Sequence, residues 1–244
     1  MKKFFRKTRQ RLLSENRFRK YLVYAIGEIV LVVIGILIAL QINNWSEGRK
    51  NDQKEALLIK NIIEDLHLDA DHINKALNEV NQQLGIVDSL LGKAIDSSKT
   101  LNYNYTGVVR YSSDFRPTTQ RNHAEAVSNL ENEAIRESLQ NYFLKEDLVM
   151  VIFLEYETII INEVRPYLRE SGMHNLNALY APRDSLRIEM LLQPKILDVE
   201  LKKVRFQQLL FERRLKTESF KRFLVELKLE NRELIKILKA NIDQ

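Results

Sequence analysis

Residues 21–42 read YLVYAIGEIVLVVIGILIALQI, an apolar run whose single charged side chain is Glu28. As an α-helix this run would be about 33 Å long, which matches a bilayer hydrocarbon core of about 30 Å. A core helix of a soluble protein is one alternative, but such helices usually have shorter apolar runs. A cleaved signal peptide is another, yet its apolar part is only about 7–15 residues long and ends at a small-x-small site. The run instead ends in Ala39-Leu40-Gln41, so we expect an uncleaved transmembrane helix over 21–42.

The excess positive charge of the chain precedes this run. The net charge is +5 with a pI near 9.2, and residues 1–20 carry nine basic side chains against Glu15 alone. Lys and Arg accumulate on the cytoplasmic side of membrane helices, so we expect the N-terminus inside and the C-terminal domain outside. Anionic lipid attracts such a tail by about 1 kcal/mol per basic residue, and no nucleic acid is needed to explain the charge. The expected headgroup contacts are Lys2, Lys3, Arg6, Lys7, Arg9, Arg11, Arg17, Arg19 and Lys20.

The first fifty residues also resemble a known family. Residues 4–50, FFRKTRQRLLSENRFRKYLVYAIGEIVLVVIGILIALQINNWSEGRK, resemble the opening of a large uncharacterised family of single-pass membrane proteins from flavobacteria and other Bacteroidota. Residues 227–239, LKLENRELIKILK, are similar to that family's usual ending. The resemblance implies a Gram-negative inner membrane with the C-terminal domain in the periplasm. It implies no activity, ligand or catalytic residue.

Glu28 lies inside the apolar run, where a carboxylate costs at least about 2.5 kcal/mol. On the same helix face, Gly35 and Ala39 form a small-xxx-small pair that lets two helices approach closely. One interpretation is a helix–helix contact in which the protonated acid acts as polar glue; the other is a proton- or ion-handling carboxylate. The expected membrane and oligomer stripe is Ala25, Glu28, Val32, Gly35 and Ala39.

Residues 43–244 predict an all-α domain, a bundle of long helices into which the transmembrane helix continues. The chain has only 7 Gly and 4 Pro, too few turn residues for a sandwich or a doubly wound sheet. Within 46–96 no proline occurs, and apolar residues recur at alternating three- and four-residue steps, which is typical of a long helix that packs on another helix. This row is Ile59, Ile63, Leu66, Ala70, Ile73, Leu77, Val80, Leu84, Val87, Leu91 and Ala94.

Turn residues divide the rest of this domain. Residues 97–121 mix Ser, Asn, Thr, Gly and Pro with tyrosines and valines, and predict an irregular or hairpin tip. Helices are expected over 122–145 and 146–170, followed by a loop over 171–195. A long helix over 196–242 should then run antiparallel to the first.

This last helix contains two apolar rows that are out of phase with each other. The mismatch between Leu215 and Phe220 predicts either a coiled-coil stutter or a tight turn. The first row is Leu197, Leu201, Val204, Gln208, Phe211 and Leu215; the second is Phe220, Leu224, Leu227, Asn231, Leu234 and Leu238.

Few residues predict chemistry. The chain has no cysteine, which excludes disulfides, thiolate metal sites and thiol nucleophiles. Glu64 and His67 share a helix face, but Asp69 and His72 are rotated from them by about 140°, so the two pairs cannot bind one ion. We therefore expect no metal, no cofactor and no catalytic residue, and a chain that is not an enzyme.

The tip is the best candidate for recognition, because tyrosines clustered around an arginine are typical of contact patches. The alternative is that the rings only cap the end of the bundle. The expected partner-binding residues are Tyr103, Tyr105, Arg110, Tyr111 and Phe115.

The sequence thus predicts an inner-membrane protein that forms homo-oligomers and acts as a non-enzymatic scaffold, or as a subunit that binds another protein. Two alternatives stay open. One is a periplasmic sensor that binds a ligand or partner at the tip, and the other is an ion-coupled stator-like subunit that uses Glu28.

Overall fold

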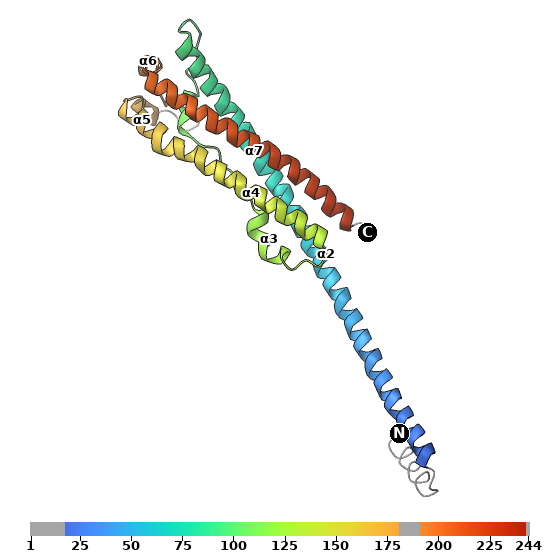
Figure 1. Ribbon diagram of the computed structural model, residues 1–244. Helices are drawn as coiled ribbons and strands as arrows, with labels where there is room; N and C mark the ends of the chain where they lie inside the picture. The colour runs from blue at the N-terminus through green and yellow to red at the C-terminus, as the bar shows by residue number, and fades with distance from the viewer. Residues whose placement is uncertain (1–17, 181–190, 243–244) are drawn as a thin grey trace. The chain divides into compact units, whose positions relative to one another are not determined.

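The computed structural model describes residues 18–180 and 191–242 (Figure 1). Among these residues the regular elements are all helices, which confirms the all-α prediction; one β-bridge, between His174 and Leu192, is isolated. The chain divides into two compact units, Met1–Leu57 and Leu58–Gln244, and each is described by itself. The longest helix, α2 (Phe18–Ile95), contributes residues to both units.

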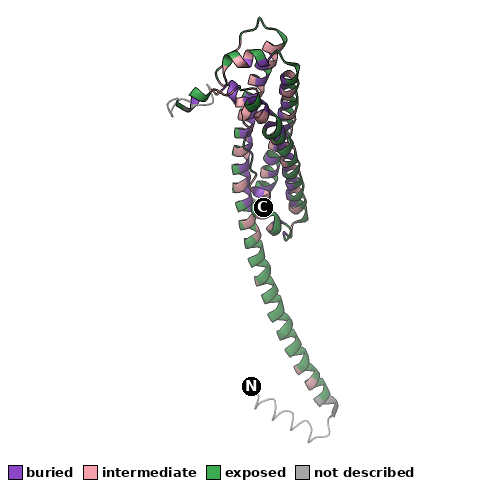
Figure 2. Ribbon diagram, turned by 90° about the vertical axis from the view of Figure 1, so that its left-hand side faces the viewer, coloured by how far each residue is buried: buried purple, intermediate pink, exposed green. Residues whose placement is uncertain are grey.

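In the first unit, α2 carries the apolar run. Between Leu22 and Ile42 no side chain is buried (Figure 2), and Leu31 is 70% exposed. By length and composition, α2 is the one helix in the described part of the chain that is long and apolar enough to cross a membrane. The basic residues predicted to contact headgroups lie outside the described residues up to position 17, and for Arg19 and Lys20 only the helical backbone is described.

The second unit is built on three long helices: α2 from Leu58 onward, α4 (Glu133–Ile159) and α7 (Val204–Ile242) (Figure 1). Asn231 of α7 pairs with the carbonyl of Leu66, whereas Arg213 pairs with Gln83, so α7 runs antiparallel to α2. The shorter elements are η1 (Thr106–Arg110), α3 (Thr119–Val127), the π-helical turn η2 (Ile160–Val164), α5 (Arg165–Glu170), η3 (Leu176–Tyr180) and α6 (Pro194–Glu200).

Each long helix buries one row of residues at alternating three- and four-residue steps, as helices do in coiled-coil-like packing. On α2 the row falls partly on residues other than those expected, because Asp69 and Gln83 are buried where Ala70 and Leu84 were predicted. The centre of the core is aromatic: the Phe220 ring stacks on Tyr156 with centroids 5.2 Å apart and contacts Phe153. The α7 row is Phe206, Leu210, Arg213, Thr217, Phe220, Leu224, Leu227, Asn231, Leu234 and Leu238.

The predicted tip is a strap, residues 101–118, that turns at η1 and runs back along α2. Ser113 donates a hydrogen bond to Glu79 (2.8 Å), and Thr118 bonds Asp69 ten residues earlier on α2. The alternative of a hairpin is wrong, because the strap contains no strand. Val109 and Phe115 of the strap are buried in the core instead of pairing across strands.

The helices after the strap begin and end differently from the prediction. No break occurs at residues 145–146; the break lies at residues 128–132, where the Asn132 side chain accepts a hydrogen bond from the Ile135 amide and caps α4. The helix expected over 146–170 is also interrupted, by η2, directly before α5 and its Pro166. Proline cannot donate a backbone hydrogen bond, and a π-helical turn changes the pairing just before it.

The last predicted helix, 196–242, is two helices separated by a turn at residues 201–203. From Val204 onward α7 is unbroken, so it has no turn near residues 216–219. The apparent phase shift arose because Val204, Phe211 and Leu215 lie on the exposed face of α7. The buried row of α7 lies on the other face of the helix and keeps its alternating three- and four-residue steps from Phe206 to Leu238.

A buried arginine joins the three long helices to the strap. The Arg213 side chain is fully buried; its Nε donates to the Val109 carbonyl (3.1 Å) and its Nη2 to Oε1 of Gln83 (3.1 Å). Gln83 Oε1 also accepts from the Tyr156 hydroxyl, which in turn accepts from the Ser113 amide (3.0 Å). Burial lowers the pKa of Arg213 to about 10, so the guanidinium remains charged at neutral pH. The guanidinium is thus bound by neutral oxygens, and it serves as a buried hydrogen-bond donor for them.

Arg213→Ala should lower the free energy of unfolding by about 2–5 kcal/mol, since it leaves a cavity and removes the donor for buried oxygens. The measurement is urea unfolding of the full chain in detergent, followed by circular dichroism. Arg214→Ala is the matched control: Arg214 pairs with Asp88 and Glu218 at the surface, so its loss should cost no more than about 1 kcal/mol. Equal losses of unfolding free energy for the two variants would contradict a stabilising role for the buried contacts of Arg213.

Candidate functional site

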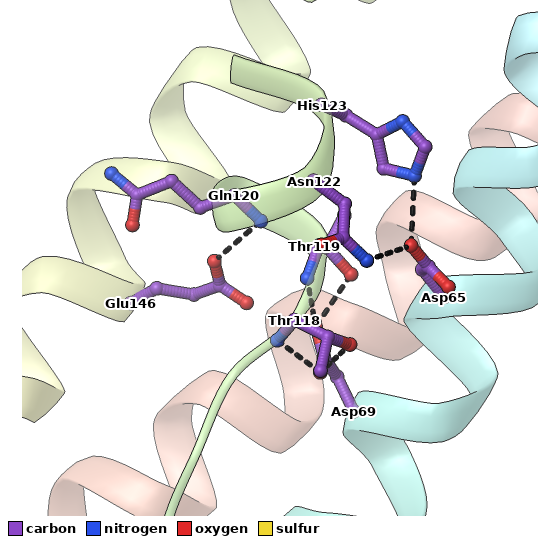
Figure 3. Close-up of polar contacts among 8 residues, drawn as sticks. All are labelled: Asp65, Asp69, Thr118, Thr119, Gln120, Asn122, His123 and Glu146. Carbon is purple, nitrogen blue, oxygen red and sulfur yellow. Dashed lines mark hydrogen bonds and ion pairs between the residues drawn. The ribbon is translucent and has the colours of Figure 1, made fainter.

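The start of α3 is held by an acid that belongs to a different helix. Thr118, at the N-cap, makes no capping bond with its own side chain. Asp69 of α2 replaces it: Oδ1 accepts from the Thr118 amide and hydroxyl, both at 2.7 Å, and Oδ2 accepts from the Thr119 amide (3.0 Å) and hydroxyl (Figure 3). A carboxylate at a helix N-terminus satisfies free amides and interacts favourably with the helix dipole. Asp69 is 1% exposed, so it is a buried acid with four donors.

A second acid, Glu146 of α4, reaches the same helix start. Its Oε2 accepts from the Gln120 amide (3.2 Å), and it is fully buried (Figure 3). Burial above all, and then the charge of Asp69 and a hydrogen bond to it, raise the pKa of Glu146 to about 9. Glu146 is therefore protonated at neutral pH and can donate its proton to Asp69. We call Asp69 and Glu146 the carboxyl pair.

A further buried polar contact lies beside the carboxyl pair. The Tyr142 hydroxyl accepts from Nδ2 of Asn231 (3.0 Å), which also donates to the Leu66 carbonyl (3.0 Å). Burial, above all, raises the pKa of Tyr142, so it stays neutral. All three long helices thus contribute polar groups at the level of α3.

Asp65, one turn before Asp69, makes the outer contacts of α3. Its Oδ2 lies 2.8 Å from Nε2 of His123 and accepts from Nδ2 of Asn122 at the same distance (Figure 3). Protonation of His123 would turn the first contact into an ion pair. These contacts are partly exposed, unlike those of the carboxyl pair.

The carboxyl pair can hold a proton on Glu146 and can fix the start of α3. In the described ranges, 18–180 and 191–242, no group of three or more His, Cys, Asp or Glu residues is placed to bind a metal ion. His67 and Asp71 are exposed, and Nζ of Lys239 lies 3.4 Å from His67 Nε2. The acids of the carboxyl pair are occupied by donors from the chain itself.

The predicted tip residues do not form one exposed patch. Tyr103 donates to both carboxylate oxygens of Asp198 (2.7 and 2.8 Å), and this bond raises its pKa. Tyr105 adopts a left-handed backbone (φ 66°), and the guanidinium of Arg110 lies 5.9 Å from the centroid of the Tyr111 ring.

Phe115 departs most from the prediction. It is 2% exposed and packs edge-on against Phe220, so it belongs to the core. In the membrane stripe, by contrast, Val32, Gly35 and Ala39 are exposed, and Ala25 and Glu28 are partly buried.

On the three long helices, sequence reasoning missed five buried polar residues because it followed mainly apolar ones. Each occupies a heptad position inside an otherwise apolar row, which is the signal that could have found it. These residues are Asp69, Gln83, Glu146, Arg213 and Thr217.

Glu146→Gln should abolish much of the pH dependence of stability between pH 5 and 9. In the wild type, the folded-state pKa is raised, so the stabilisation from the bound proton is present at low pH and is lost as pH rises through about 9. The glutamine keeps a donor toward Asp69 at every pH. We expect the free energy of unfolding of the wild type, relative to the variant, to fall by at least about 1.4 kcal/mol from pH 5 to pH 8.

Chemical unfolding in detergent at several pH values measures this difference. Glu137→Gln, an exposed change on the same helix, is the control and should leave the pH profile of the wild type unchanged. Parallel profiles for the wild type and Glu146→Gln would show that the carboxyl pair holds no proton.

Comparison with known proteins gives one match, at residues 28–104, to a model described as a family of unknown function (DUF6090). No curated protein and no solved structure matches the chain. The matched residues include Asp69 of the carboxyl pair and Gln83, which binds Arg213, and they end within the strap. This part of the chain is therefore similar to an uncharacterised domain.

Proposed function

We propose that the chain is a single-pass inner-membrane protein whose helical domain is a self-associating, non-enzymatic scaffold or partner-binding subunit. The observation that carries the proposal is the exposure of the apolar run on α2. Every side chain from Leu22 to Ile42 is exposed or only partly buried. Apolar surface gains about 25 cal/mol per Å² when it leaves water, and lipid provides that transfer along the whole run.

The charge of the N-terminal tail supports the orientation. Its basic residues favour a cytoplasmic N-terminus in contact with anionic lipid, and hence a periplasmic helical domain. The resemblance of residues 4–50 to single-pass membrane proteins of Bacteroidota favours the same setting. The open surface at Gly35, where an added Cβ would meet no atom within 4 Å, leaves room for the close approach of a second helix.

The use of the buried polar groups favours a scaffold over an enzyme. Asp69 accepts four hydrogen bonds that hold α3, and Arg213 binds backbone and side-chain oxygens of the bundle itself. Groups committed to the chain's own backbone stabilise the fold. The contacts at the predicted tip favour a scaffold over a tip-binding sensor for the same reason, since Tyr103 is bound to Asp198 and Phe115 is buried.

Single cysteines test the placement, because the chain has no cysteine of its own. With a membrane-impermeant maleimide on intact cells, Ser128→Cys, at an exposed site of the helical domain, should be labelled. Ser14→Cys, in the basic tail, should be labelled only after permeabilisation. The full chain should also stay with the membrane fraction after an alkaline wash. The reverse labelling pattern, or recovery of the chain in the soluble fraction, would overturn the proposed function.

A further inference from the structure

The outward side of α4 carries a second heptad row, opposite its buried one. Seven residues at alternating four- and three-residue steps are all exposed, and their middle is apolar: Leu144 is 65% exposed and Val151 53%. A helix that only covers its own core would place polar residues here. The outer α4 row is Glu137, Asn141, Leu144, Leu148, Val151, Glu155 and Thr158.

The outward side of α7 carries a similar row. Its ten residues are also exposed and alternate in the same way, with apolar groups around Phe211 and around Leu229. Part of it is the row that seemed out of phase in the sequence. The outer α7 row is Val204, Gln208, Phe211, Leu215, Glu218, Arg222, Val225, Leu229, Arg232 and Lys236.

The two outer rows are complementary in charge. The ionisable residues of the outer α4 row are both acidic, and α4 as a whole has six acidic against two basic residues. The outer α7 row contributes Arg222, Arg232 and Lys236, and α7 has ten basic against five acidic residues. The one acid of the outer α7 row, Glu218, is already paired with Arg214 (2.7 Å). Opposite charge across a contact favours association and selects the partner surface.

The rows also match in register. Within one copy, Lys216 pairs with Glu155 (2.7 Å) and Asn231 with Tyr142 (3.0 Å), which sets the level of α7 against the antiparallel α4. In two copies that stand side by side at the same level, the same correspondence places Leu144 and Leu148 opposite Val225 and Leu229. It places Glu137 opposite Lys236, which also pairs with Glu233 in its own copy (2.7 Å), and Asn141 opposite Arg232.

The correspondence brings one like-charged pair together, Glu155 and Glu218. Each of these acids is neutralised within its own copy, by Lys216 and by Arg214. The remaining apolar residues at that end, Leu215 and Phe211, lie opposite Thr158 and Ile161, and Ile161 is 42% exposed.

We propose that the outer α4 row of one copy packs against the outer α7 row of a second copy of this chain. The inference rests on the proposed function, because anchoring in one membrane is what holds two copies at the same level. The two rows lie on different helices and face away from the shared core, so the contact is heterologous. Such a contact leaves one free row at each end and extends into files of copies or closes into rings.

Two blocked variants of the full chain test the interface in phosphatidylethanolamine–phosphatidylglycerol vesicles, read with a lysine-reactive crosslinker. Leu148→Glu blocks the outer α4 row and Leu229→Glu the outer α7 row; both residues are exposed, at 41% and 57%. The wild type should give a ladder of dimers, trimers and larger species. Each blocked variant alone should lose at least ten-fold of the crosslinked product, because a new carboxylate would face an apolar partner. An equal mixture of the two should give dimers and no larger species, since each variant retains one intact row.

Leu68→Glu, at an exposed leucine of α2 outside both rows, is the matched control and should keep the wild-type ladder. Circular dichroism should show equal thermal midpoints for all three variants. Blocked variants that keep the full ladder would overturn this interface while leaving self-association intact. A mixture without dimers would overturn the pairing of α4 with α7. A monomeric wild type in the membrane would overturn the interface and the self-association of the proposed function together.

Discussion

The second unit depends on one constraint: each polar group in its core must find a partner inside the protein. Asp69 and Glu146 meet it through the first amides of α3, and Arg213 through the carbonyl of Val109 and the side chain of Gln83. An unpaired buried polar group costs about 1–3 kcal/mol, and a charged one more. Several of the partners come from the strap and from α3, so these connecting residues are required by the core. The strap and α3 thereby form a fourth layer against the three long helices, and this layer contains little regular structure.

The same contacts determine how the helices align. Apolar rows that repeat every seven residues pack almost equally well after a shift of one heptad. A shift of α7 by one heptad would separate Arg213 from Gln83 and Asn231 from Tyr142, and would leave these groups buried without partners. The difference in free energy between the two registers therefore lies mainly in four polar side chains: Arg213, Gln83, Asn231 and Tyr142. Asn231 and Tyr142 fix the register of α7 at the level of Asp69, and Arg213 and Gln83 fix it at the other level.

Sequence reasoning predicted the helical class and the long first helix, because uninterrupted heptads and scarce Gly and Pro leave few alternatives. It failed where polar residues interrupt a row. On α7 the buried row passes through Arg213 and Thr217, so a reading of apolar residues alone moved to the exposed Phe211 and Leu215 and found a false change of phase. The strap was mistaken for a possible hairpin because Val109 and Tyr111 favour strands locally, whereas the core uses Val109 in a 3-10 helix. The carboxyl pair was not predictable as a pair, since nothing in the sequence shows that α4 runs alongside α2 with Glu146 at the level of Asp69.

The buried and the exposed faces of α4 and α7 have different physical requirements. The inner rows must exclude water, which explains their aromatic centre and the hydrogen bonds that Asp69, Glu146 and Arg213 make inside the protein. The outer rows have no such demand: they contain a few apolar residues among charged ones, too few to hold two copies together strongly in dilute solution. A membrane changes this balance, because proteins anchored by one helix share a thin layer and a common orientation, which raises their effective concentration for one another. On the proposed anchoring, a weak and charge-matched surface is sufficient for assembly, and a stronger one would leave an apolar patch exposed before the chain reaches the membrane.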